Sequence, residues 1–165
     1  MARNEMIMLA VAMCVMSATV VSATRPVVNP FVLQGRVYCD TCRTGFETPA
    51  TTPISGAEVK LECRDRITQE VKHTDYGTTD STGTYKILVK EDHQDELCDC
   101  MLVSSPQNDC ATADPGRDRA LVILTSNNGM ASKDRFANAL GFMRDEPLSE
   151  CKQVLQQYEL VSEED

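Results

Sequence analysis

Two cysteines three positions apart carry the first candidate chemistry in this sequence. The stretch VYCDTCR places Cys39 and Cys42 at the end of a segment with the two-residue periodicity of a β-strand. Such a pair can belong to a metal knuckle, to a redox-active dithiol or to a disulfide framework. The compartment of the protein decides among these, because thiols stay reduced in the cytosol but oxidise to disulfides in the secretory pathway.

The amino-terminal residues predict export. Arg3 precedes an almost wholly apolar run over residues 7–21, and small side chains lead up to Ala23. This is the pattern of a secretory signal peptide with cleavage after Ala23. The run is shorter than the roughly 20 residues that a spanning helix needs. We therefore expect residues 1–23 to be a signal peptide, and residues 24–165 to form one domain that is secreted to the extracellular space without membrane insertion.

Seven cysteines remain after such processing, which is consistent with three disulfides and one free thiol. Spacing alone leaves every pairing open, because seven choices of the unpaired cysteine and fifteen pairings of the other six give 105 schemes. Strand alternation places Cys63 on an inward row, and it places Cys98 and Cys100 on one face of another strand. If Cys98 bridges to Cys63, Cys100 behaves as a small buried hydrophobe. An intermolecular disulfide through Cys100 is the alternative.

Metal and redox sites fit the cysteines less well. Four thiolates could form a closed tetrahedral zinc site from Cys39, Cys42, Cys98 and Cys100, but no second CxxC pair accompanies the first. A thioredoxin-like pair begins a helix within a βαβ unit, whereas here a strand precedes the pair and a Thr/Pro-rich loop follows it. We therefore expect structural disulfides, no metal and no cofactor.

Catalytic motifs are not found around the remaining polar residues. His73 lies on a weak strand and His93 in an acidic connector, and neither stands in an HExxH or GxSxG context. Both are expected to be solvated. The acidic residues of 91–96 lack the ligand order of a calcium loop, so a solvated connector is expected there, with weak calcium binding or contact with a basic partner as alternatives. The protein is therefore predicted not to be an enzyme, with no catalytic residues.

The elements that must hold these residues are mainly strands. Alternating apolar and polar residues predict half-buried strands over residues 31–39, 57–64, 70–76, 85–89, 97–104 and 120–125. A further strand or irregular chain is expected within 130–145, and an amphipathic helix over 147–159 that begins at Pro147. Many short strands separated by turns favour a β-sandwich or a small barrel. The net charge of −9 and the pI near 4.7 make nucleic acids unsuitable partners.

Several blocks of the sequence resemble a known family. QGRVYCDTCR (34–43), GAEVKLECRDR, TDSTGTYKILV, LVSSPQNDC, DPGRDRALVILTSNNG and RFANALGFMRDEPLSEC are similar, in order, to blocks of the Ole e I-like family of pollen proteins, over residues 31–158. The resemblance implies an all-β fold: a seven-stranded antiparallel β-barrel or sandwich with three disulfides. It implies the pairs Cys39 to Cys110, Cys42 to Cys151 and Cys63 to Cys98. Cys100 then remains as the free thiol.

The resemblance also implies a function. Proteins of this family are secreted, pollen-associated and non-enzymatic, so we expect binding to an extracellular protein, such as a receptor-like kinase ectodomain, or to a cell-wall component. Pollen hydration, germination or tube growth would be the setting, and IgE would recognise the protein as an allergen. A structural wall protein that binds glycans is one alternative, which the absence of tryptophan weakens. A hydrolase or hydrolase inhibitor is the other.

Overall fold

The structure, a computed structural model, describes residues 30–161, and the side chains of 159–161 are not considered. The expected signal peptide and its cleavage after Ala23 lie outside this range. The elements are β1 (Phe31–Asp40), β2 (Thr52–Pro53), β3 (Glu58–Asp65), β4 (Val71–Thr78), β5 (Thr84–Val89), β6 (Glu96–Ser104), β7 (Thr112–Ala113), β8 (Arg119–Val122), β9 (Asp134–Phe136), β10 (Leu140–Met143) and α2 (Cys151–Val161). No helix among these residues is long and apolar enough to cross a membrane.

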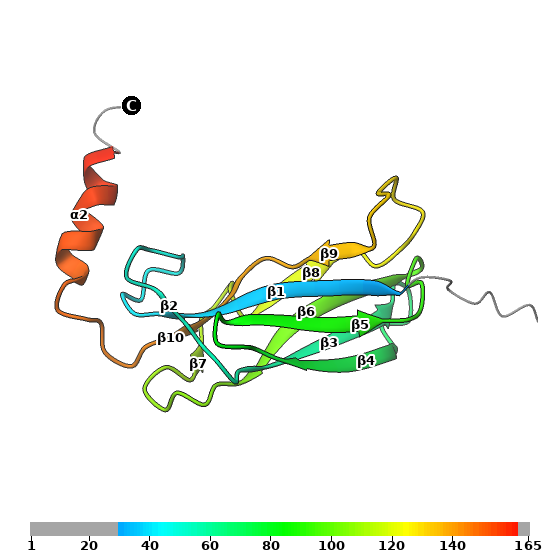
Figure 1. The fold of residues 1–165 in the computed structure, drawn as a ribbon, viewed down its shortest axis with the longest axis horizontal. Helices are drawn as coiled ribbons and strands as arrows, with labels where there is room; N and C mark the ends of the chain where they lie inside the picture. The colour runs from blue at the N-terminus through cyan, green and yellow to red at the C-terminus, as the bar shows by residue number, and fades with distance from the viewer. Residues whose placement is uncertain (1–29, 162–165) are drawn as a thin grey trace, which may run out of the picture.

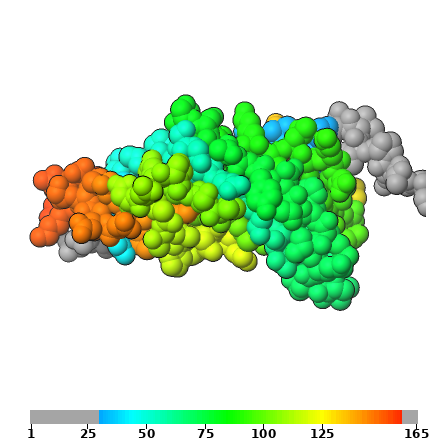
Figure 2. All heavy atoms as spheres, turned by 90° about the horizontal axis from the view of Figure 1, so that it is seen from below, coloured from blue at the N-terminus to red at the C-terminus, as the bar shows by residue number. Residues whose placement is uncertain are grey.

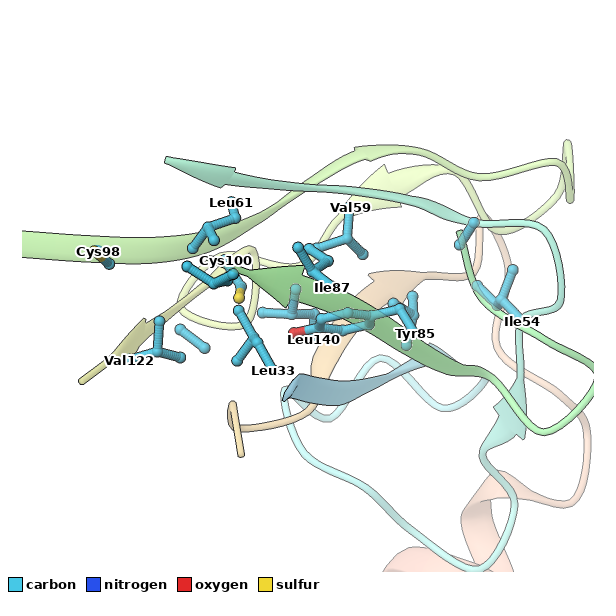
Figure 3. Packing of buried hydrophobic residues seen from close by; sticks show 14 of the residues in the cluster. Leu33, Ile54, Val59, Leu61, Tyr85, Ile87, Cys98, Cys100, Val122 and Leu140 are labelled. Atoms are coloured by element: carbon cyan, nitrogen blue, oxygen red, sulfur yellow. The ribbon is translucent and has the colours of Figure 1, made fainter. Parts of the chain in front are cut away.

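The strands form two sheets that pack face to face (Figure 1). One sheet has the order β4-β3-β6-β8, and the other is built on β1, which pairs with β2, β5, β9 and β10, while β7 pairs with β10. Inward residues of both sheets meet in one apolar cluster, in which Leu33, Leu61, Tyr85 and Leu140 are fully buried (Figure 3). The alternation in the sequence is the cause, because every second side chain along most of β1, β3, β5 and β8 faces this core.

The long strand β1 is the axis of its sheet. Its first part pairs with β5 in antiparallel fashion and with β9 in parallel, and its last part pairs with β2 and with β10. Two glycines permit tyrosines to lie against this sheet: Gly35 is opposite Tyr85, and Gly141 is opposite Tyr38. A side chain on either glycine would overlap the facing ring.

Arg135 fixes β9 to the end of the four-stranded sheet. Its buried guanidinium donates hydrogen bonds to the backbone oxygens of Ile123 and Thr125, at 3.1 and 3.0 Å, and to two carbonyl oxygens just before it. The same group lies 4.8 Å from the centre of the Phe31 ring, a cation–π contact. One side chain thus ties three segments of chain together.

The expected seven-stranded antiparallel β-barrel or sandwich is confirmed in part, as a mostly β fold with one short carboxyl-terminal helix and three disulfides. The described residues form ten strands, and their two sheets are not closed into a barrel. β9 and β10 run parallel to β1, because the chain after β8 returns along β1 in the same direction. Three of the additional or uncertain strands, β2, β7 and β9, have only two or three residues. Such strands are too short to carry a detectable alternation.

The carboxyl-terminal helix begins later than the sequence suggests. α2 starts at Cys151 rather than at Pro147, because the preceding residues form a turn in which the Leu148 amide donates to the Thr41 carbonyl. The Tyr158 ring meets Phe46 edge to face, with centroids 5.2 Å apart. Figure 2 shows α2 at one end of an elongated molecule, opposite the end that residues around 60–75 occupy.

Candidate functional site

Three disulfides connect distant parts of the chain. They join Cys39 to Cys110, Cys42 to Cys151 and Cys63 to Cys98, with Cα–Cα distances of 6.0, 5.4 and 4.0 Å. Cys39 and Cys42 therefore have different partners, and in this structure they do not share a metal or redox site. All six sulfur-bearing side chains are buried. Their chemical role is to restrict the unfolded chain.

Cys100 is the one free cysteine of the described residues, and it lies in the core. It is fully buried two residues after Cys98, opposite Leu61 on the neighbouring strand. Figure 3 shows its side chain among the apolar side chains of the interior. Burial raises the pKa of the Cys100 thiol to about 11, although the nearby Tyr85 hydroxyl opposes this shift. The thiol is therefore protonated at neutral pH, and it is a poor nucleophile.

The polar residues of VYCDTCR organise the chain around them. The buried Asp40 carboxylate accepts hydrogen bonds from the backbone amides of Cys42, at 3.1 Å, and Gly45, at 2.8 Å. The buried Thr41 hydroxyl donates to the Ala50 carbonyl at 2.8 Å. These side chains close the loop between β1 and β2, a role that the spacing of the cysteines does not indicate.

A second buried polar group lies beside this loop. Asp114 is buried, and one of its carboxylate oxygens has no hydrogen-bond partner among the described residues. Burial, reinforced by the negative charge of Asp40, raises the pKa of Asp114, while Arg117 acts in the opposite direction. Burial likewise raises the pKa of Tyr38 to about 12. Arg117 donates to the Gly45 carbonyl at 2.8 Å, so this cluster holds loops together rather than presenting a reactive group.

The acidic connector before β6 is more ordered than its composition suggests. His93 is only 4% exposed, so the expectation that it is solvated is wrong. Its amide donates to the Leu124 carbonyl at 2.8 Å, which draws the residue inward, and its ring Nδ1 lies 2.8 Å from a carboxylate oxygen of Glu96. The rings of His93 and His73 are neighbours, with centroids 4.8 Å apart. Polar neighbours in the sequence gave no signal of this burial.

The outer face of the four-stranded sheet exposes three neighbouring apolar side chains. Leu97, Leu121 and Ile123, here called the β6–β8 patch, are 39, 62 and 60% exposed. The register pairs Cys98 with Val122 and Asp99 with Leu121, which brings Ile123 beside Leu97 on the same face. β8 is the last strand of this sheet among the described residues. The patch therefore lies on the last strand of this sheet, just before the carbonyls that Arg135 of β9 binds.

An ion-paired row adjoins this patch on β3. Glu62 receives hydrogen bonds from the Lys60 ammonium at 2.8 Å and from the Arg64 guanidinium at 2.7 Å. The Lys60 hydrogen bond is the largest cause that lowers the pKa of Glu62, and Arg64 adds to it. These charges satisfy one another, so a partner could cover the neighbouring patch without leaving them unpaired.

The other sheet carries a surface hollow of about 290 Å³. The exposed ring of Phe136 forms part of its wall, together with the polar residues Gln34, Arg36 and Thr84. An aromatic face next to hydrogen-bonding groups can contact a small polar ligand. This hollow and the β6–β8 patch are therefore separate candidate surfaces.

These features define a class of protein: a β-sandwich with three disulfides, a free core thiol and a short carboxyl-terminal helix. The family model described as "Pollen protein Ole e 1 like" matches residues 29–159, and the chain belongs to this family. The resemblance seen in the sequence is thereby confirmed.

Named relatives agree with this assignment. "Protein DOWNSTREAM OF FLC" of Arabidopsis thaliana is 48% identical over 82% of this chain and 83% of its own length. "Pollen allergen Phl p 11" of Phleum pratense is 47% identical over 79% and 92%. The crystal structure of the major plantain pollen allergen Pla l 1 matches with a TM-score of 0.65 and 28% identity, over 74% of this chain and 99% of that one.

Proposed function

We propose that the protein is secreted after loss of residues 1–23, with cleavage after Ala23, and acts without catalysis by binding a protein in the extracellular space of pollen. The partner would be a receptor-like kinase ectodomain or a cell-wall protein, and the setting would be pollen hydration, germination or tube growth. Membership of the pollen protein family supports the setting. The β6–β8 patch is the observation that supports protein binding, because exposed apolar side chains that gather on one face of a sheet mark interaction sites.

The patch suits a protein partner better than a small ligand. Its three apolar side chains lie beside Asp99, which is opposite Leu121, and Arg119 at its border lies 3.2 Å from the Met101 sulfur, which keeps the guanidinium beside the apolar area. A partner can bury Leu121 and Ile123 at the centre of the interface and pair with the charged side chains at its rim.

The test compares two variants with the unaltered protein. Leu121→Asp combined with Ile123→Asp places charges on the patch. Leu88→Asp places a charge on a leucine of the other sheet that is 51% exposed. Binding to a panel of pollen-tube receptor-like kinase ectodomains would be measured by biolayer interferometry. We expect the patch variant to bind at least about tenfold more weakly and the control to bind normally. Equal binding by both variants would refute the role of the patch.

A glycan-binding wall protein is the second candidate function, and the hollow at Phe136 favours it. The exposed ring could contact the apolar face of a sugar, while Gln34, Arg36 and Thr84 could bind its hydroxyls. Glycan arrays probed with the unaltered protein and with Phe136→Ala test this candidate. Glycan binding that depends on Phe136, without any signal from receptor ectodomains, would replace the first proposal. A hydrolase inhibitor would instead show inhibition across a hydrolase panel.

Recognition by IgE belongs to the same proposal. Relatives such as the Phleum pratense protein are named as allergens, and we expect IgE from sensitised patients to bind the oxidised protein. Reduction and alkylation of its three disulfides should abolish much of this binding, because exposed loops such as 105–118 would lose their fixed shape. Equal IgE binding before and after reduction would show that only linear segments are recognised.

A further inference from the structure

Two histidine rings at the end of the molecule opposite α2 have unpaired nitrogens. The Nε2 atoms of His73 and His93 are both buried, and neither has a hydrogen-bond partner among the described residues. Leaving a buried polar atom unpaired costs about 1 to 3 kcal/mol, so two such atoms in adjoining rings call for an explanation. The rings approach to 4.8 Å between centroids at an angle of 45°. A shared ligand would satisfy both nitrogens.

A carboxylate completes the cluster. Ligand atoms of His73, Glu91 and His93 all lie within 4.8 Å of one another. We propose that these three residues bind one zinc ion, and that Glu96 orients His93 for this purpose. This site differs from the cysteine site considered for the sequence, and it departs from the expectation that the protein binds no metal. The nearby sulfurs of Cys63 and Cys98 are not ligands, because they form a disulfide.

Glu96 places His93 in the form that a metal requires. Its carboxylate oxygen lies 2.8 Å from Nδ1 of His93, and this contact favours the tautomer with the proton on Nδ1, which leaves the Nε2 lone pair for a metal. A carboxylate behind a ligating histidine is the usual outer partner of a metal site, because it fixes the tautomer and the ring orientation. His93 is further restrained by its backbone bonds to Leu124 and Glu96.

Hydrogen bonds and a disulfide hold the segments that carry the three proposed zinc ligands close to their binding positions. His73 lies on β4 opposite Cys63, whose disulfide fixes the adjoining strands. The loop that carries Glu91 is anchored by Asp92, which accepts a hydrogen bond from the Ser126 amide at 2.8 Å. Ligand atoms around tetrahedral zinc are roughly 3.3 Å apart, given bonds of about 2.0 to 2.2 Å. The exposed Glu91 side chain can close the remaining gap by a rotamer change.

The donor set selects the kind of ion. Two imidazoles and one carboxylate match zinc, which binds nitrogen and carboxylate oxygen and leaves a fourth position to water in three-ligand sites. Calcium and magnesium prefer oxygen donors alone. Copper(II) also binds imidazole tightly, so a separate titration with Cu²⁺ alone is compared with the zinc titration.

The experiment titrates the oxidised, untagged secreted chain with Zn²⁺ alone after treatment with a chelator. We expect one zinc per chain at micromolar concentration, a zinc-dependent rise in Tm, and zinc-dependent changes in the ¹⁵N shifts of the His73 and His93 rings. His73→Gln and Glu91→Gln should each weaken binding by at least about tenfold. Asp95→Asn, an exposed acid of the same loop, is the matched control and should bind as the unaltered chain does.

Clear outcomes would overturn the site. One is the absence of stoichiometric zinc binding, and another is unchanged zinc binding by both His73→Gln and Glu91→Gln. A third is a loss of zinc affinity in Asp95→Asn as large as in the two ligand variants, which a diffuse acidic surface would produce. A preference for copper(II) with no measurable zinc binding would also overturn it. Because His73 is half-buried and Glu91 is exposed, both substitutions leave the core intact, and circular dichroism checks that each variant folds.

Discussion

Replacing Gly35 by alanine would test the packing at the centre of the β1 sheet. The added Cβ would lie 2.4, 2.6 and 2.9 Å from Oη, Cζ and Cε1 of Tyr85, closer than any nonbonded contact allows. Tyr85 is fully buried, and the two residues are direct partners across β1 and β5. The ring cannot move away without opening the strand ladder or displacing the core around it.

Two effects of opposite sign decide the magnitude. Alanine in a strand is ordinarily more stable than glycine by roughly 0.5 to 1 kcal/mol. Overpacking a closed core costs about 1 to 3 kcal/mol, and the full burial of Tyr85 favours the upper end. We expect a net loss of about 2 kcal/mol. With about 2.1 cal/mol/K of unfolding entropy per residue over roughly 130 residues, this loss lowers Tm by about 7 °C.

Thermal and urea unfolding of the oxidised protein measure this loss. Gly77→Ala is the control, because its Cβ would meet one aliphatic branch of Ile87, with Cγ1 at 2.8 Å, rather than a rigid ring, and its cost should be smaller. In a Tyr85→Leu background the clash is absent, so Gly35→Ala should there be neutral or stabilising. A Gly35→Ala variant as stable as the unaltered protein, or more so, would refute the reasoning.

Three further predictions concern buried charge and covalent connections. Because burial and the charge of Asp40 raise the pKa of Asp114, the folded state holds this proton more tightly than the unfolded state, and stability falls as pH rises from the unfolded to the folded pKa. Asp114→Asn should therefore increase the free energy of unfolding at pH 7 but not below the ordinary aspartate pKa; urea titrations that show no gain at pH 7 would contradict this. Replacing Cys42 and Cys151 by serine removes a bridge with a sequence separation of 109, so stability should fall by at most about 4.8 kcal/mol and α2 should exchange its amides rapidly; a protected α2 would show that packing alone holds it. Arg135→Lys should cost about 2 kcal/mol, because one ammonium cannot reach carbonyls of both segments that the guanidinium joins, and an unchanged Tm would argue against this anchoring role.

The sequence predicted the long strands because each carries its own alternation. β1 and β3 begin and end within a residue or two of their expected bounds, and the inward positions of Cys63 and Cys98 followed from the same pattern. β9 and β10 were not resolved as separate strands, because their pairing depends on how the chain returns to β1 rather than on their own composition. The alternation of apolar and polar residues therefore predicts where strands lie, but it does not predict which distant strands pair with them in parallel.

The candidate sites were harder to predict than the strands. His93 is surrounded in the sequence by acidic and polar residues, which indicate a solvated loop, yet one backbone bond to Leu124 buries it. The exposure of the β6–β8 patch could not be predicted either, because Leu121 and Ile123 fit the alternation of an ordinary strand. Their significance arises only because β8 ends its sheet. Burial and exposure at these positions depend on tertiary neighbours that no local pattern records.

The proposed zinc site and the β6–β8 patch are close enough to affect each other. Glu96, which orients His93, is followed directly by Leu97 of the patch, and the His93 amide binds the Leu124 carbonyl, next to Ile123. Zinc that restrains His93 would restrain both edges of the patch, so it should reduce the ordering cost of partner binding. Linkage then requires the partner to tighten zinc binding by the same factor. Measuring partner affinity with and without zinc, and zinc affinity with and without partner, checks both directions, with Glu91→Gln as the control in which zinc should have no effect. A partner affinity that zinc does not change, together with a zinc affinity that the partner does not change, would show that the two surfaces work independently.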